Sequence, residues 1–198
     1  MKITLELLRS KGACSAGMSW VEENLPEGAE YQDFLDALAA ADKPDWASWL
    51  LANFGKTTAV KTVTSVTAGT KHIFAAGRLV FECPVRVLGR IQAGESIEAD
   101  MGIEAGESIE ADMGIKAGWG IKAGGSIKAG ESIEAGVGIE AGESIKAGLG
   151  ITCKLDISVR FRIFAGVCGW KMPSTEEMTI ACRAVKSGTV AFGVVVNL

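Results

Sequence analysis

The sequence predicts a mainly β protein, a triangular β-solenoid preceded by a helical segment. An aliphatic residue stands at every sixth position, at sixteen consecutive places from Ile73 to Ile163. A period of six is neither the 3.6 of a helix nor the 2 of an open strand, and it is typical of a solenoid in which each hexad forms one strand and one turn. Two further observations are a regular alternation of charge within the array and a change of composition near residue 57.

Composition and charge exclude several classes of protein. The apolar fraction of 48% is sufficient to build a core, and the net charge of −4 gives no reason to expect nucleic-acid binding. The opening residues MKITLELLRSKG lack the apolar stretch of a signal peptide, and no run of eighteen apolar residues predicts a membrane span. Five cysteines without a CxxC pair indicate reduced thiols, so we expect a cytoplasmic protein.

Residues 1–56 are expected to form a small helical cap. The apolar pattern predicts a first short helix that ends near Gly12, and Ser15 is a plausible N-cap for a second. A third helix carries an apolar stripe, and a fourth begins near Pro44 and ends at Gly55. The stripe of the third helix consists of Tyr31, Phe34, Leu35 and Leu38.

Residues 57–72 are rich in β-branched side chains and predict an extended lead-in to a solenoid over residues 73–168. The regular array spans residues 91–150, with the hexad I-x-A-[GD]-x-[SG]. Side chains alternate along a strand, so the Ile and Ala of each hexad point inward and the residue between them faces solvent. We expect the fourth residue to need a positive φ at a corner. Cys153 stands where Ala is usual, which favours a structural thiol.

The number of hexads in a coil follows from the charges at the outward second position. Stacked strands lie about 4.8 Å apart, so like charges on neighbouring coils repel. With three hexads per coil each residue stacks on the one eighteen positions later, which places Lys116 between Glu98 and Glu134 and leaves Lys128 on Lys146 as the only like pair. With two hexads per coil, glutamates would stack on glutamates. The sequence therefore predicts a triangular coil of about 18 residues, and sixteen hexads make a little over five coils.

Both ends of such a solenoid expose unpaired strand edges that need a cover. The helical residues 1–56 are the expected cover for the first coil. Residues 169–198 are expected to form a C-terminal β-hairpin with strands in 179–196 and a turn at Ser187 and Gly188. This hairpin would cover the last coil or pair with another chain.

The array resembles the left-handed hexapeptide-repeat β-helices, with Ile in their small slot and Ala in their aliphatic slot. The resemblance implies a left-handed solenoid. The motifs LLRSKGACSAG near the N-terminus, the IxAGxx hexads and the later RIFAGVCGW and SGTVAFG also resemble a group of uncharacterised phage and prophage proteins. That resemblance implies a small protein carried by mobile elements, many of which encode inhibitors of host defence systems.

Enzymes built on hexapeptide helices are acyltransferases that use a histidine base. His72 is the single histidine and lies at the start of the first coil, where a cap or turn role is the better interpretation. The corner carboxylates are expected to be solvated side chains rather than an acid–base pair or a calcium site; they are Glu95, Asp100, Glu107, Asp112, Glu131 and Glu143. No cofactor and no metal site are expected.

Met101, Trp119 and Val137 are the candidate interaction residues. Each stands eighteen positions from the next, so they are expected to form one exposed apolar column with Trp119 at its centre. The favoured hypothesis is a non-catalytic interaction protein that inhibits a bacterial defence complex of the kind targeted by anti-CRISPR proteins. We expect a protein partner and a homo-oligomer. The alternatives are an acyltransferase relative and a structural, filament-forming protein.

Overall fold

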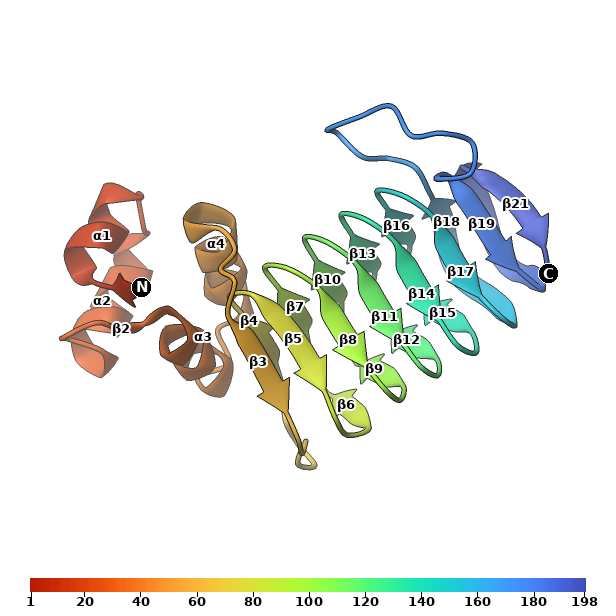
Figure 1. The fold of residues 1–198 in the computed structure, drawn as a ribbon. Coiled ribbons are helices and arrows are strands. Elements are labelled where there is room, and N and C mark those ends of the chain that lie inside the picture. Colours follow the sequence, from red (N-terminus) through yellow and green to blue (C-terminus); the bar gives the residue numbers. More distant parts are fainter.

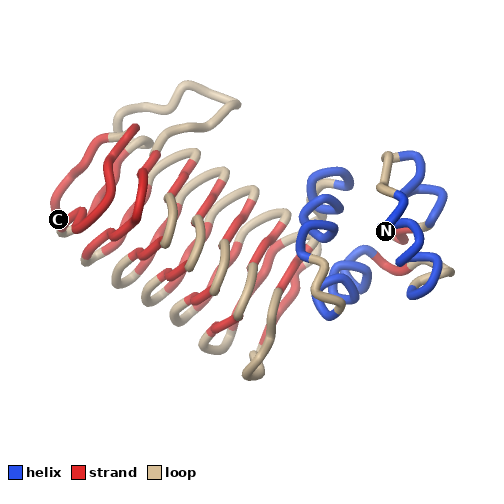
Figure 2. Tube along the Cα trace, turned by 180° about the vertical axis from the view of Figure 1, so that it is seen from behind, coloured by secondary structure: helices blue, strands red, loops and turns tan.

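The computed structural model describes residues 1–198 and shows a β-solenoid with helices at its N-terminal end (Figure 1). The solenoid has about 8 turns of about 18 residues, which confirms the predicted fold class and coil length. Figure 2 shows the helices at one end and the strand-rich coils continuing to the other. None of the helices has the length and apolar character needed to cross a bilayer.

The helical segment contains four helices and one two-stranded ribbon. The helices are α1 (Leu5–Ser10), α2 (Ser15–Asn24), α3 (Tyr31–Ala40) and α4 (Pro44–Phe54). Strands β1 (Lys2–Ile3) and β2 (Ala29–Glu30) pair antiparallel. The prediction that Ser15 caps α2 was wrong by one residue. Cys14 occupies the N-cap, and its Sγ accepts a hydrogen bond from the backbone N–H of Gly17 at 3.4 Å.

The solenoid has three faces, which we name A, B and C. Face A consists of β3 (Val60–Val63), β5 (Arg78–Phe81), β8 (Ile97–Ala99), β11 (Ile115–Ala117), β14 (Ile133–Ala135), β17 (Ile151–Cys153), β19 (Thr179–Cys182) and β21 (Val194–Asn197). Face B consists of β4 (Ile73–Ala75), β7 (Ile91–Ala93), β10 (Ile109–Ala111), β13 (Ile127–Ala129) and β16 (Ile145–Ala147). Face C consists of β6 (Val85–Val87), β9 (Ile103–Ala105), β12 (Ile121–Ala123) and β15 (Ile139–Ala141).

Two long strands near the C-terminus bend from face C to face B. They are β18 (Asp156–Phe164) and β20 (Ala184–Phe192), which pair with each other in parallel. Because β18 pairs with β15 through its first half and with β16 through its second half, it joins these two faces into one continuous sheet.

Neighbouring coils pair in parallel, with each residue opposite the residue eighteen positions later. Lys122 lies between Glu104 and Glu140, and Lys128 lies on Lys146 as the predicted like pair. The Lys122 Nζ is 3.1 Å from the Glu140 Oε2, but both side chains are more than half exposed. Each such pair therefore contributes about 0.2–1 kcal/mol at most, and its main effect is on register. The handedness of the solenoid stays a prediction.

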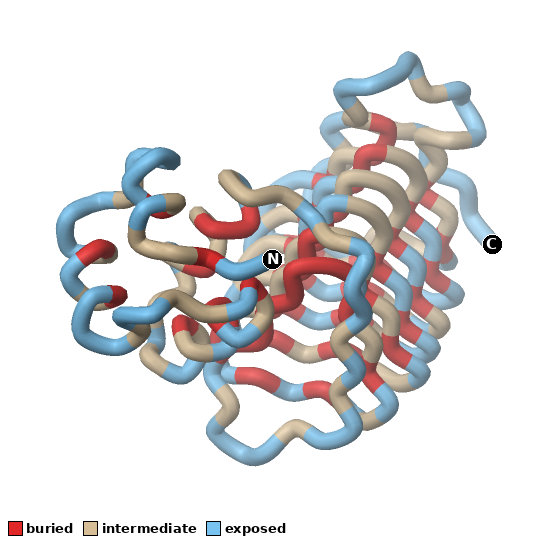
Figure 3. The backbone as a smooth tube through the Cα atoms, turned by 60° about the vertical axis from the view of Figure 1, so that its left-hand side comes forward, coloured by how far each residue is buried: buried red, intermediate tan, exposed pale blue.

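The core is a column of inward Ile and Ala side chains that runs the length of the solenoid. These residues are buried, and together with the bulkier side chains of the end coils they form one continuous cluster of 34 buried residues. Figure 3 shows buried residues on every coil, alternating with exposed ones. Cys153 is buried in this column at an Ala position, and burial raises the pKa of its thiol to about 11. A thiol in that state is inert, which supports its structural interpretation.

The glycines at the fourth hexad position differ from the prediction in their conformation. No residue of the array between 91 and 150 has a positive φ. Glycine is needed there because the carbonyl of the preceding coil approaches closely: a Cβ on Gly118 would lie 2.1 Å from the Asp100 oxygen, and one on Gly136 would lie 1.8 Å from the Gly118 oxygen. The constraint is therefore steric contact between coils rather than backbone conformation.

The helical segment covers the first coil through α3 and α4. Phe74 and Ala76 of this coil are buried in the core of the helical segment rather than in the solenoid core. The side-chain amide of Gln32 satisfies the edge of β4: its Nε2 donates to the Phe74 oxygen at 2.9 Å, and its Oε1 accepts from the Ala76 N–H at 3.0 Å. Gln32 thus takes the place of a neighbouring strand.

The predicted C-terminal β-hairpin was wrong. Strands β19 and β20 do not pair with each other; β19 stacks in parallel on β17, β20 on β18, and β21 on β19. Gly188, with φ 93°, lies at a corner of a coil instead of in a hairpin turn. The solenoid also begins earlier than residue 73, because β3 pairs with β5 in the same parallel register. The structure therefore has more coils than the five and a fraction that the hexads alone predict.

Candidate functional site

Exposed apolar side chains form a ridge along the corner between faces A and C. Met101, Trp119 and Val137 stack on successive coils, as their spacing predicts, through backbone hydrogen bonds of 3.3 Å from Trp119 to Met101 and 3.2 Å from Val137 to Trp119. Trp119 is 59% exposed, and Met101 is half-buried. The next coil adds Leu155, whose N–H donates to the Val137 oxygen at 2.8 Å. We call these four residues the apolar ridge.

Leu155 is absent from the predicted column because its hexad, ITCKLD, departs from the repeat pattern. Its position eighteen residues after Val137 was the one sequence feature that could have identified Leu155 as part of the column. It is 40% exposed, close to the 42% of Val137, so it continues the ridge without a break.

A row of glycines runs beside the apolar ridge and leaves a groove. Gly102, Gly120 and Gly138 occupy the sixth hexad position on successive coils, and we call them the glycine floor. The groove has a volume of about 590 Å³ and extends from Pro84 to Ser158, with Val137 on its ridge side. Since none of these glycines carries a Cβ, the floor lies lower than the side chains on either side.

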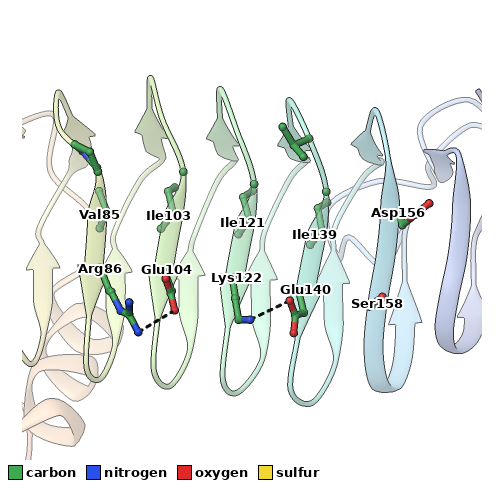
Figure 4. Close-up of a pocket in the computed structure, with 15 residues that line it drawn as sticks. Val85, Arg86, Ile103, Glu104, Ile121, Lys122, Ile139, Glu140, Asp156 and Ser158 are labelled. Atoms are coloured by element: carbon green, nitrogen blue, oxygen red, sulfur yellow. Dashed lines mark ion pairs between the residues drawn. The ribbon is translucent and has the colours of Figure 1, made fainter.

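The other side of the groove is formed by outward side chains of face C. Arg86, Glu104, Lys122 and Glu140 alternate in sign along the solenoid axis (Figure 4). We call these four residues the charge ladder. The dashed lines in Figure 4 mark its two ion pairs, of 3.7 Å between Arg86 and Glu104 and 3.1 Å between Lys122 and Glu140. The ladder presents both signs of charge and no continuous positive stripe.

The other two corners lack this combination. On the corner between faces C and B, the sixth position carries Ser108, Ser126 and Ser144 where the glycine floor has glycine. On the corner between faces B and A, apolar residues alternate with glutamates, as in Met113, Glu131 and Leu149. One repeat pattern therefore builds three corners, and only the corner between A and C combines an unbroken apolar ridge with a glycine floor.

Asp156 closes the groove at its C-terminal end. Its carboxylate accepts hydrogen bonds from the Arg183 guanidinium, with a distance of 3.0 Å from Nε to Oδ1, and this contact lowers the pKa of the carboxyl. Asp156 therefore stays ionised, and its charge is held in place by Arg183.

His72 lies at the first coil with both ring nitrogens occupied. Its Nδ1 accepts a hydrogen bond from the Arg90 N–H at 3.0 Å, so Nε2 carries the proton and donates to Asp42 Oδ1 at 2.9 Å. The side chain is 7% exposed. Hydrogen bonds from Lys71, and secondarily from His72, lower the pKa of the Asp42 carboxyl. His72 thus joins the helical segment to the solenoid, as a cap residue would.

The predicted corner carboxylates are distributed over different corners. Glu95 and Glu131 lie between faces B and A, whereas Glu107 and Glu143 lie between faces C and B. Glu107 accepts a hydrogen bond from Arg90 at 2.9 Å. No group of three or more His, Cys, Asp or Glu side chains lies close enough together to hold a metal ion.

A second hollow, of about 250 Å³, lies within the helical segment. It is lined mainly by apolar side chains of α1 to α4, with Trp46 and Trp49 among them, and Cys14 and Asp45 also contribute. Sequence reasoning assigned these tryptophans to helix faces and missed the hollow, because it forms only where α2 packs against α4. Trp20 and Trp46 meet edge to face at 6.2 Å.

Comparison with known proteins bears on the helical segment alone. Residues 1–56 match the family model described as the YdhT N-terminal domain. This stretch coincides with the segment that forms α1 to α4. No curated protein matches the chain, and no solved structure matches it.

Proposed function

We propose that the protein is a non-catalytic interaction protein that binds a protein partner along the groove between faces A and C. The observation that carries this proposal is the coincidence of the apolar ridge and the glycine floor on one corner of three. An exposed Trp at the centre of an apolar row is the kind of residue that dominates binding energy at protein interfaces. The rigid coils lower the entropy cost of binding.

The charge ladder favours a protein over a nucleic acid as the partner. Nucleic-acid binding requires a stripe of positive charge to neutralise phosphates. In the ladder every basic residue is paired with an acidic one, as Arg86 is with Glu104 and Lys122 with Glu140. Such a surface can orient a protein partner without attracting phosphates.

The specific form of the proposal is a phage or mobile-element inhibitor that blocks a bacterial defence complex, such as a CRISPR effector, in the host cytoplasm. Its support is the resemblance of the chain's motifs to phage and prophage proteins. An inhibitor of this kind must compete with a natural ligand, and a preformed groove suits that task.

The two alternative functions are less well supported. An acyltransferase relative needs a free histidine base, whereas both ring nitrogens of His72 are engaged within the chain. Growth of a filament by stacking of coils needs two open ends, whereas α3 and α4 cover the first coil at Phe74.

The test combines a pull-down from a bacterial lysate that contains a CRISPR effector with an immunity assay in the same strain. The tagged protein should retain the effector in stoichiometric amount and restore phage plaques. The variant Trp119→Glu should lower the affinity by about 30-fold or more, since hot-spot residues are worth about 2 kcal/mol or more. Gly120→Ser, which fills the floor with the residue that the other corners carry, should weaken binding as well.

The matched control is Leu88→Glu, which places the same charge at an apolar residue of similar exposure, 61% against 59% for Trp119, on a different corner. It should bind as the unchanged protein does. Equal loss of binding for both variants would reject the groove as the site. The proposed function would be rejected if the tagged protein retained only nucleic acid, or if it turned over an acyl-CoA.

A further inference from the structure

The last coil of the solenoid presents a long strand edge that no part of the chain covers. It consists of β20, which has nine residues, and β21, which has four. On one side β20 pairs with β18 and β21 with β19; on the other side neither strand has a partner. The backbone N–H and C=O groups of this edge are therefore free to pair with another strand.

The core of the solenoid is open at the same place. Val185 and Val190 stack on Ile157 and Ile163, and Val195 stacks on Ile180. These isoleucines are 0% exposed, whereas Val195 is 42% exposed, since no strand of the structure stacks on β21. The exposed apolar area includes further side chains of the last coil, namely Phe192, Val194 and Val196.

The composition of this edge lacks the usual protection against pairing. Edge strands that stay single normally carry charges or proline. In residues 184–198 the only ionisable side chain is that of Lys186, and there is no proline. At the opposite end of the solenoid, the Gln32 side chain satisfies the edge of β4, and helices cover Phe74. The helical segment thus protects β4 at one end, whereas neither β20 nor β21 is protected at the other.

We infer that the last coils of two copies of this chain pair with each other, end to end, around a twofold axis. The axis would pass through the middle of β21 on face A and through the opposite corner at Gly188, where β20 bends from face C to face B. A rotation about this axis places β21 antiparallel to its copy. The same rotation places each half of β20 antiparallel to the other half of the partner's β20.

This arrangement pairs every free edge of the coil at once and closes the two cores against each other. It is an isologous contact, in which the same surface is used twice. It ends at two copies, because the helical segment covers the first coil of each copy and prevents further stacking. A foreign strand could pair with β20 or with β21, but it would not match both and the open core together.

The size of the contact sets its strength. Residues 184–198 are fewer than the about 20–30 residues that each side of a standard interface contributes. We therefore expect a reversible dimer with a dissociation constant of about 1–100 µM, not a permanent one. The contact is independent of the groove between faces A and C, since β11 and β12, the strands on either side of Trp119, lie away from the last coil (Figure 1).

Sedimentation equilibrium of the full chain from about 1 µM to 1 mM tests this pairing. The mass should rise from 20.7 kDa to twice that value and then stay constant. Val195→Lys puts a charge into the open core and should hold the protein at one copy throughout. Val196→Lys should weaken the dimer at least tenfold, because Val196 stacks on the outward Ala181 and the two ammonium groups would meet near the axis.

The control is Leu88→Lys, at an exposed residue far from the last coil, which should dimerise as the unchanged chain does. Circular dichroism verifies that each variant is folded, and Val196→Lys tests the pairing even if Val195→Lys loosens the last coil. A mass of one copy up to 1 mM, growth beyond two copies, or equal dissociation of Leu88→Lys would each overturn the proposal.

Discussion

Gly118 and Gly120 lie two positions apart in one turn, yet the structure constrains them differently. A Cβ on Gly118 would meet the Asp100 oxygen at 2.1 Å, whereas a Cβ on Gly120 would meet the Gly138 oxygen at 3.4 Å. Gly118 is therefore required for the contact between coils. Packing between coils does not require a glycine at Gly120. The lack of a side chain there instead shapes the surface, because it keeps the floor of the groove low.

The matched variants Gly118→Ala and Gly120→Ala test this difference. Gly118→Ala should lower the free energy of unfolding by about 1–3 kcal/mol, the usual cost of an overpacked site. Gly120→Ala should change it by less than about 0.5 kcal/mol. Urea denaturation measures both values, and equal effects would contradict the assignment of separate roles.

Asp100 and Asp112 show how a side chain is accommodated at the position of Gly118. Their N–H groups donate to the preceding coil at 3.5 Å and 3.3 Å, whereas that of Gly118 does so at 2.9 Å. The coils separate slightly at these two aspartates. The expected penalty at Gly118 is therefore a few kcal/mol at most and not a failure to fold.

At the scale of the strands, the outward charges select the register between coils. A slip of one hexad would place Glu98 beside Glu110 instead of beside Lys116, which turns an attractive pair into a repulsive one. Lys128 and Lys146 are the exception, because like charges face each other there on β13 and β16.

Reversal of a single outward charge tests this selection of register in both directions. Lys146→Glu should raise the free energy of unfolding by about 0.2–1 kcal/mol, because it gives Lys128 an opposite neighbour. Lys122→Glu should lower it by a similar amount, because three glutamates would then adjoin. Both effects should largely vanish in 1 M NaCl, where the screening length is about 3 Å. A loss of stability in both variants would show that the charges do not act through this register.

At the scale of the whole molecule, the helical segment and the solenoid share buried residues. Phe74 belongs to strand β4 of the solenoid but packs in the helical core, and it is 0% exposed. In a solenoid, each unit is stabilised mainly by its neighbours, so this contact couples the two parts. We expect the helical segment and the first coils to unfold together.

Phe74→Ala should remove this coupling. It should cost about 3–5 kcal/mol, and the helical signal in circular dichroism should then be lost at lower urea than the β signal of the solenoid. In the unchanged protein the two transitions should coincide. The matched control is Ile121→Val, a buried change in the middle of the solenoid, which should cost about 0.5–1.5 kcal/mol without separating the signals. Separate transitions in the unchanged protein would contradict the coupling.

The site was only partly predictable. The spacing of Met101, Trp119 and Val137 was sufficient to place them in one column, since coil length and column follow from the same charge pattern. Leu155 and the glycine floor were missed. A glycine at the sixth position looks like any turn residue, and its effect on the surface depends on the side chains that neighbouring strands place beside it.

The sequence by itself determined the six-residue period, the inward Ile and Ala, the coil of about 18 residues and the helical nature of residues 1–56, because each of these depends on patterns that repeat along the chain. The tertiary structure alone decided how the strands pair at the two ends of the solenoid. Apolar stretches around Gly188 are compatible with an antiparallel hairpin or with two sides of a coil, and the free edges of β17 and β18 select the coil because they offer parallel partners. Pairing at an edge is a non-local property, so the sequence predicted a helical cover for the first coil but neither the Gln32 contacts to β4 nor the unpaired edge of β20 and β21.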